Sequence, residues 1–114
     1  MAKLTFTPVE KKILEINGEE YEVRVTDIEV IEMIAEFEDL AKALEKKRTS
    51  LKPREISNTY KTVTRSIDKM LGDGALEKIM GTSSLPTAKI VEVFQKVSDE
   101  IVMIYEADAR KLYE

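Results

Sequence analysis

The sequence predicts an α+β fold that is mostly α, in which an N-terminal β-hairpin packs on a bundle of three main helices plus one short helix. Three observations support this prediction: an Asn-Gly turn between two alternating segments, apolar residues at helical spacing in three later segments, and glycine or proline near the ends of those segments. The length of 114 residues is typical of one domain. We therefore expect a single domain over residues 1–114, with a β-element in residues 1–25 and a helical part in residues 26–114.

A further short strand is expected over residues 3–7, ahead of the hairpin. Polar and apolar side chains alternate there, so that Leu4 and Phe6 fall on one side. Pro8 ends the segment because proline has no backbone N–H to donate to a strand partner. The β-element is therefore expected to consist of the hairpin, with this segment as an additional third strand.

The hairpin is predicted from residues 12–16 and 19–25, which flank Asn17-Gly18. This dipeptide suits a two-residue type I′ turn because both of its residues take positive φ. The turn fixes the register and gathers the apolar side chains on one face, which another element must cover. The residues of this face are Leu14, Ile16, Tyr21 and Val23.

The first long helix is expected over about residues 27–47. Thr26 and Glu29 have the spacing of a capping box, in which each side chain accepts a hydrogen bond from the backbone N–H of the other. Val25 and Val30 occupy the positions of a hydrophobic staple around this cap. Apolar residues then recur at spacings of three and four, which is typical of a helix with one buried face. They are Val30, Ile34, Phe37, Ala41 and Leu44.

Three more helices are expected after a loop over residues 48–53. Pro53 is suited to the first turn of the second helix, and Gly72-Asp73-Gly74 ends it. A short helix follows over residues 75–80, and a long final helix occupies about residues 87–113. The main apolar stripe of this last helix is Ile90, Phe94, Val97, Ile101 and Ile104.

The composition argues against an enzyme. The chain has no cysteine and no histidine, which excludes disulfides, thiolate nucleophiles, Cys/His zinc sites and histidine general bases. The carboxylates of the first helix lie opposite its apolar stripe, where a solvated face is expected, and no glycine-rich phosphate loop is present. We therefore expect no catalytic residue, no metal ligand and no cofactor.

Charge is unevenly distributed along the chain. The formal net charge is −4, but residues 15–39 carry ten acids against one base, and residues 42–54 carry a net charge of +5. The basic segment, with Lys46, Lys47 and Arg48 at its centre, has three interpretations: completion of a helix dipole, self-association with the acidic segment of another copy, or contact with nucleic-acid phosphates. Base-stacking aromatic residues are missing from it, so nucleic-acid binding is not favoured.

The final helix carries a second apolar stripe beside the main one. Such a helix either packs on two sides inside the molecule or presents part of its surface to a partner helix. We expect internal packing near residues 90–104 and a partner beyond residue 105, where less chain remains to cover the helix. The candidate partner-binding residues are Val91, Val102, Tyr105, Ala109, Leu112 and Tyr113.

One short motif suggests a family. Ile67-Asp68, Gly72-Asp73-Gly74 and Glu77-Lys78-Ile79-Met80-Gly81 follow one another between two helices, and Val91–Val97 lies in the closing helix. In motif and in order of elements, roughly residues 15–110 resemble the tail assembly chaperones of long-tailed phages and prophages of Gram-positive bacteria.

The resemblance implies a chaperone without catalytic activity. Proteins of this family bind the tape measure protein, a long, helical and apolar chain, and keep it soluble while tail tube subunits polymerise around it. The resemblance also implies a homo-oligomer, tail tube protein as a further partner, action in the bacterial cytoplasm and absence from the mature virion. The longest apolar stretch, residues 101–105, is too short to cross a membrane, so no membrane partner is expected. The alternatives are a small nucleic-acid-associated regulator that uses residues 42–54 and a structural tail component.

Overall fold

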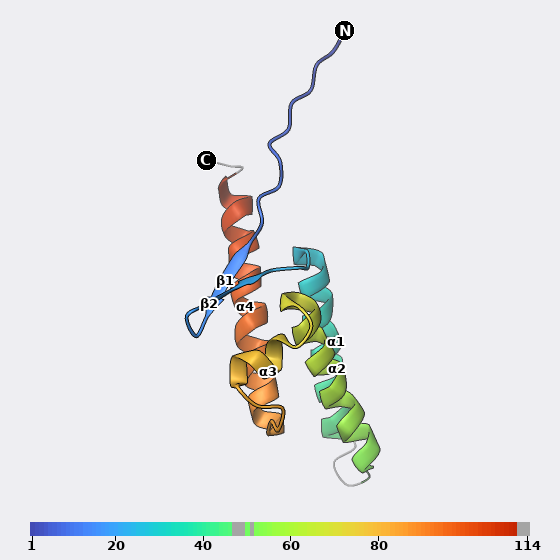
Figure 1. Cartoon of the computed structure of the whole chain (residues 1–114). Helices are drawn as coiled ribbons and strands as arrows, with labels where there is room; N and C mark the ends of the chain where they lie inside the picture. The colour runs from blue at the N-terminus through green and yellow to red at the C-terminus, as the bar shows by residue number, and fades with distance from the viewer. Residues whose placement is uncertain (47–49, 51, 112–114) are drawn as a thin grey trace.

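The computed structural model describes residues 1–46, 50 and 52–111. A two-stranded hairpin and four helices follow one another in the described part of the chain, which confirms the predicted α+β, mostly α, class (Figure 1). The expected last residues of the first and last helices, Lys47 and Tyr113, lie outside the described residues. The elements are β1 (Ile13–Ile16), β2 (Glu19–Glu22), α1 (Asp27–Lys46), α2 (Pro53–Leu71), α3 (Ala75–Met80) and α4 (Thr87–Lys111).

Helices α1 and α2 run side by side, and both pack against α4 (Figure 1). The short helix α3 follows α2 and lies beside the turn of the hairpin, where the Asn17 side-chain amide donates a hydrogen bond to the Ile79 carbonyl oxygen at 3.0 Å. The hairpin crosses α4, and an ion pair between Lys12 and Asp108 joins the start of the hairpin to the last turns of that helix.

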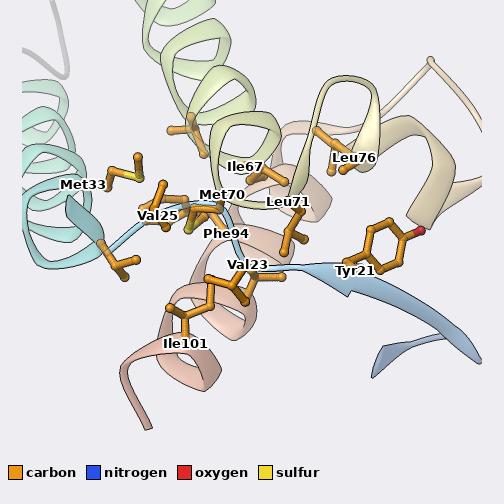
Figure 2. Close-up of a cluster of buried hydrophobic side chains, with 14 of the residues drawn as sticks. Tyr21, Val23, Val25, Met33, Ile67, Met70, Leu71, Leu76, Phe94 and Ile101 are labelled. Carbon is orange, nitrogen blue, oxygen red and sulfur yellow. The ribbon is translucent and has the colours of Figure 1, made fainter. Parts of the chain in front are cut away.

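The core lies where these elements meet (Figure 2). Phe94 and Ile101 of α4 share one buried cluster with Ile67 and Met70 of α2, and these four side chains are at most 2% exposed. The ring of Phe37 in α1 lies 5.1 Å from that of Phe94, measured between centroids. Full burial of each large apolar side chain contributes roughly 1.5–3 kcal/mol.

The hairpin has the predicted register and turn. Leu14 pairs with Tyr21, and Ile16 pairs with Glu19. Asn17 and Gly18 both take positive φ, 52° and 80°, as a type I′ turn requires. The predicted apolar face is directed inward, because its members are buried or belong to the shell packed against the core: Leu14, Ile16, Tyr21 and Val23.

The expected strand over residues 3–7 is wrong. Residues 1–12 form no regular secondary structure, and the N-terminal part of this segment extends away from the helices (Figure 1). Leu4 and Phe6 are each 82% exposed, and Val9 is 96% exposed. Alternation shows which side chains would share a face, but a strand forms only where its backbone pairs with a neighbouring edge. No strand takes that place in the described part of the chain.

The capping box at the start of α1 forms as predicted. The Thr26 N–H donates to Glu29 Oε1 at 3.1 Å, and the Glu29 N–H donates to Thr26 Oγ1 at 3.2 Å. The hydrogen bond from the Thr26 backbone lowers the pKa of the Glu29 carboxyl, and Lys69 adds to the shift. Val25 and Val30, the two staple residues, are buried on either side of the cap.

The motif with three glycines forms a corner between α2, α3 and the hairpin. Gly72 takes φ 115° and ψ 155°, a conformation open almost only to glycine, and a Cβ at this position would lie 3.2 Å from the Arg24 guanidinium. The Arg24 N–H donates to the Met70 carbonyl oxygen at 2.8 Å, so the chain after β2 is held against the end of α2. The Asp68 carboxylate accepts a hydrogen bond at 3.2 Å from the backbone N–H of Leu76 in α3.

We expect Thr26→Ala to lower the free energy of unfolding by about 1 kcal/mol, because it removes the hydroxyl that accepts the Glu29 N–H. Urea titration followed by circular dichroism measures the loss. Thr26→Ser is the matched control, since it keeps the hydroxyl, and it should unfold close to the wild type. Equal losses for both variants would contradict a capping role.

We expect Gly72→Ala to cost about 3 kcal/mol, because the alanine must adopt a strained backbone conformation and displace Arg24. Gly74→Ala is the control: Gly74 is also left-handed, at φ 77°, but its Cβ would meet open space, so about 1 kcal/mol is expected. Adding Arg24→Ala should recover part of the Gly72→Ala loss. Thermal unfolding of the four proteins measures these differences, and equal losses at the two glycines would contradict crowding by Arg24.

Candidate functional site

An open groove of about 810 Å³ lies between the first half of α2 and the segment that leads into α4. Ile56 and Tyr60, one turn apart on α2, form one wall, and Leu85 and Ile90 come from the other side. The remaining lining residues are Pro53, Ser57, Lys61, Thr64, Arg65 and Thr87. We call this hollow the α2–α4 groove.

The local sequence explains why this groove stays open. On α2, the residues that enter the core are Val63, Ile67 and Met70, all in its second half. Ile56 and Tyr60 precede them and are half-buried. The chain between α3 and α4 passes the groove with only Leu85 packed against the core. Two apolar walls therefore face each other with no side chain of the described part of the molecule filling the space between them.

The α2–α4 groove is apolar along its floor and basic at its edge. Among the described residues that line it, the charged ones are Lys61 and Arg65, one helical turn apart, and both are exposed. Three hydroxyl side chains, those of Ser57, Thr64 and Thr87, complete the lining. The groove thus offers apolar contact area, aromatic surface and two positive charges, which suits the apolar stripe of a helix flanked by acidic residues.

A second groove, of about 390 Å³, lies between β1 and α4. We call it the β1–α4 groove. Its apolar residues are Leu14, Ile16, Ile79, Val93 and Val97, and its charged residues are Glu15, Glu92, Lys96 and Glu100. Hydrogen bonds from the ammonium groups of Lys96 and Lys89, at 3.1 and 3.2 Å, lower the pKa of Glu92.

The predicted partner stripe of α4 is divided between the interior and the surface. Val102 and Tyr105 pack against the core cluster, and the Tyr105 hydroxyl donates to the Val25 carbonyl oxygen at 2.7 Å. Val91 is half-buried, and Ala109 is exposed. Leu112 and Tyr113 lie outside the described residues. The described members therefore do not form one continuous free ridge, and a partner at the remaining surface stays a prediction.

The basic segment is only partly described. Lys46 is exposed in the last turn of α1, whereas Lys47 and Arg48 lie outside the described residues. Self-association or nucleic-acid contact through these three residues therefore stays a prediction.

The acidic face of α1 has basic neighbours within the molecule. Lys69 Nζ of α2 lies 3.5 Å from Glu29 Oε2. Arg65 lines the same shallow hollow as Glu32 and Glu36. Part of the negative charge of residues 15–39 is therefore balanced by basic residues of α2, which follow about thirty to forty positions later in the chain.

The comparisons with known proteins leave the family open: no family model matches the chain, and no curated protein or solved structure matches it significantly. Within the described residues, no group of three or more carboxylates is placed to hold a metal ion. No helix of the described part of the chain is both long and apolar enough to cross a membrane.

The sequence did not predict the α2–α4 groove. Ile56 and Tyr60 stand at helical spacing with Val63 in the predicted second helix, but this spacing does not indicate that the first half of its apolar side stays uncovered. The signal available in the sequence was the short segment between Gly81 and Pro86, in which Leu85 is the one large apolar residue that could cover this side of α2.

We expect Tyr105→Phe to lower the free energy of unfolding by about 1 kcal/mol, because it leaves the Val25 carbonyl oxygen without its donor. Burial raises the pKa of the Tyr105 phenol, so the wild type should also lose stability above pH 10, and this part of the loss should be absent from the variant. Urea titration at pH 7 and pH 10.5 measures both effects. Tyr60→Phe, at the open groove, is the control and should leave stability almost unchanged.

Proposed function

We propose that this protein is a phage tail assembly chaperone that binds the tape measure protein and keeps it soluble during tail assembly. Two features support the proposal: the resemblance in residues 66–81 and 91–97, and the α2–α4 groove with its apolar floor and basic edge. The proposal depends mainly on the groove, because the groove offers a binding surface for a helical, apolar client. The resemblance alone does not indicate where on the molecule such a client would bind.

The groove suits a client helix in a specific way. An amphipathic helix binds a groove through apolar residues spaced at three and four along one face. Ile56, Tyr60 and Leu85 would contact that stripe, and Lys61 and Arg65 would face acidic residues beside it. Aromatic side chains such as Tyr60 bury large areas with little loss of conformational freedom, so we expect Tyr60 to be the main anchor.

The shape of the groove also suits release. Its lining is open to solvent, and no side chain in the described part of the chain encloses the space that a bound helix would occupy. A client bound in this way can be displaced when tail tube subunits compete for the same apolar residues. We propose that the chaperone acts in the bacterial cytoplasm as a homo-oligomer, contacts tail tube protein at this step and stays out of the mature virion.

Co-expression with the tape measure protein of the same phage tests the proposal. We expect the soluble fraction of the tape measure protein to rise strongly with the wild type. Tyr60→Ala should weaken binding by about 10–30-fold, because a central aromatic contact is typically worth about 2 kcal/mol. Sedimentation of lysates and pull-down through a tag on the chaperone measure the two quantities.

Met103→Ala is the matched control, because Met103 is an apolar residue of α4 that is 59% exposed and lies outside the groove. It should bind like the wild type. A tape measure protein that is equally insoluble with and without the wild type would contradict the function. Full solubilisation by Tyr60→Ala would keep the function and contradict the groove as the binding site.

A further inference from the structure

The outer edges of the two hairpin strands have different surroundings. The Val23 N–H donates to the Lys12 carbonyl oxygen at 2.8 Å, which places Lys12, and by alternation Leu14 and Ile16, at the positions bonded to the partner strand. The backbone N–H and C=O groups of Ile13 and Glu15 therefore point away from β2. In the described part of the chain no strand pairs with that side of β1.

The opposite edge of the hairpin differs. There the Arg24 N–H donates to the Met70 carbonyl oxygen at 2.8 Å, so the end of α2 takes up the backbone group that follows β2. The end of α2 thus limits access to the β2 edge where that strand ends, whereas β1 offers its outward backbone groups as a template for another strand.

The β1–α4 groove lies beside this open edge. A strand added to β1 would run over α4, and its inward side chains would enter the groove, because Leu14 and Ile16 of β1 already line it together with Val93 and Val97 of α4. Backbone pairing and side-chain burial would therefore occur at the same place, as in strand addition to an exposed sheet edge.

The chain itself carries a segment suited to this edge. Residues 3–7 alternate polar and apolar side chains, and Leu4 and Phe6 are each 82% exposed. The segment runs away from its own hairpin and has no regular structure (Figure 1). Its sequence has the alternation typical of a β-strand, but in the described part of the chain no strand pairs with it.

Charge also favours the match. Lys3 is the only charged residue in residues 1–9. The β1–α4 groove carries three carboxylates, Glu15, Glu92 and Glu100, against one ammonium group, Lys96. A basic segment would thus add to an edge of net negative charge, which stabilises the pairing and orients the approach.

We propose that residues 3–7 of one copy add as a third strand to the β1 edge of a second copy, with Leu4 and Phe6 in the β1–α4 groove. Thr5 then lies opposite Glu15, because this pairing aligns Leu4 and Phe6 with Leu14 and Ile16 whether the added strand runs parallel or antiparallel. Donor and acceptor are different surfaces of the chain, so each copy supplies one strand and receives another.

The absence of cysteine makes the test direct. Thr5→Cys and Glu15→Cys are prepared separately, mixed and treated with a short thiol-specific crosslinker. We expect a cross-linked product that contains one copy of each variant, identified by mass spectrometry of the joined peptides. The matched control replaces Glu15→Cys by Glu38→Cys, an exposed glutamate of α1 away from the hairpin, and should give little product.

Phe6→Asp in the Thr5→Cys chain should reduce the yield about tenfold or more, because it removes the largest side chain from the groove. Phe6 is exposed in the single copy, so this variant should fold like the wild type. A yield no higher than with Glu38→Cys would overturn the proposal. A link formed within one chain in a protein carrying both cysteines, with none between chains, would also overturn it, because the segment would then fold back on its own β1 edge.

Discussion

Burial of one wide face of α4 determines where everything else in the molecule lies. Phe94 and Ile101 occupy the centre of the core, and α1, α2 and the hairpin are placed by their contacts with that face. The edges of the same face are not fully covered. Ile90 borders the α2–α4 groove, and Val93 and Val97 border the β1–α4 groove. Both candidate binding surfaces are therefore margins of the core, and their apolar character follows from the width of the buried stripe.

Patterns of neighbouring residues in the sequence predicted most of the fold. The features that these patterns did not predict depend on contacts between segments far apart in the chain. The hairpin register followed from Asn17-Gly18, and the start of α1 followed from Thr26 and Glu29, because each depends on residues a few positions apart. The strand over residues 3–7 was wrong because pairing depends on a neighbour that the spacing does not supply. Tyr105 was assigned to a partner surface, but its hydroxyl bonds to Val25, eighty residues earlier. The α2–α4 groove was missed for the same reason.

The motif that suggested a family has a structural explanation in this chain. Gly72 gives the backbone its turn beside Arg24, and Asp68 holds the first turn of α3. The Lys78 ammonium of α3 lies 2.8 Å from the Glu19 carboxylate and over the ring of Tyr21, and the hydrogen bond that Lys78 donates to Glu19 raises the pKa of Lys78. These residues fix the angle between helices and hairpin. The motif therefore has a structural role in this chain and does not itself indicate a binding surface. The proposal of a helical client depends instead on the α2–α4 groove.

The ion pair between Lys12 and Asp108 has a mechanical consequence. It lies at the point where residues 1–12 enter the folded part of the molecule, and the hydrogen bond that the Lys12 ammonium donates to Asp108 raises the pKa of Lys12. Tension applied to this N-terminal arm reaches this pair and the backbone hydrogen bond from the Val23 N–H to the Lys12 carbonyl oxygen first. The ion pair transmits load to α4, and the hydrogen bond transmits load to the segment that follows β2. The arm is thus tethered to the longest helix of the molecule.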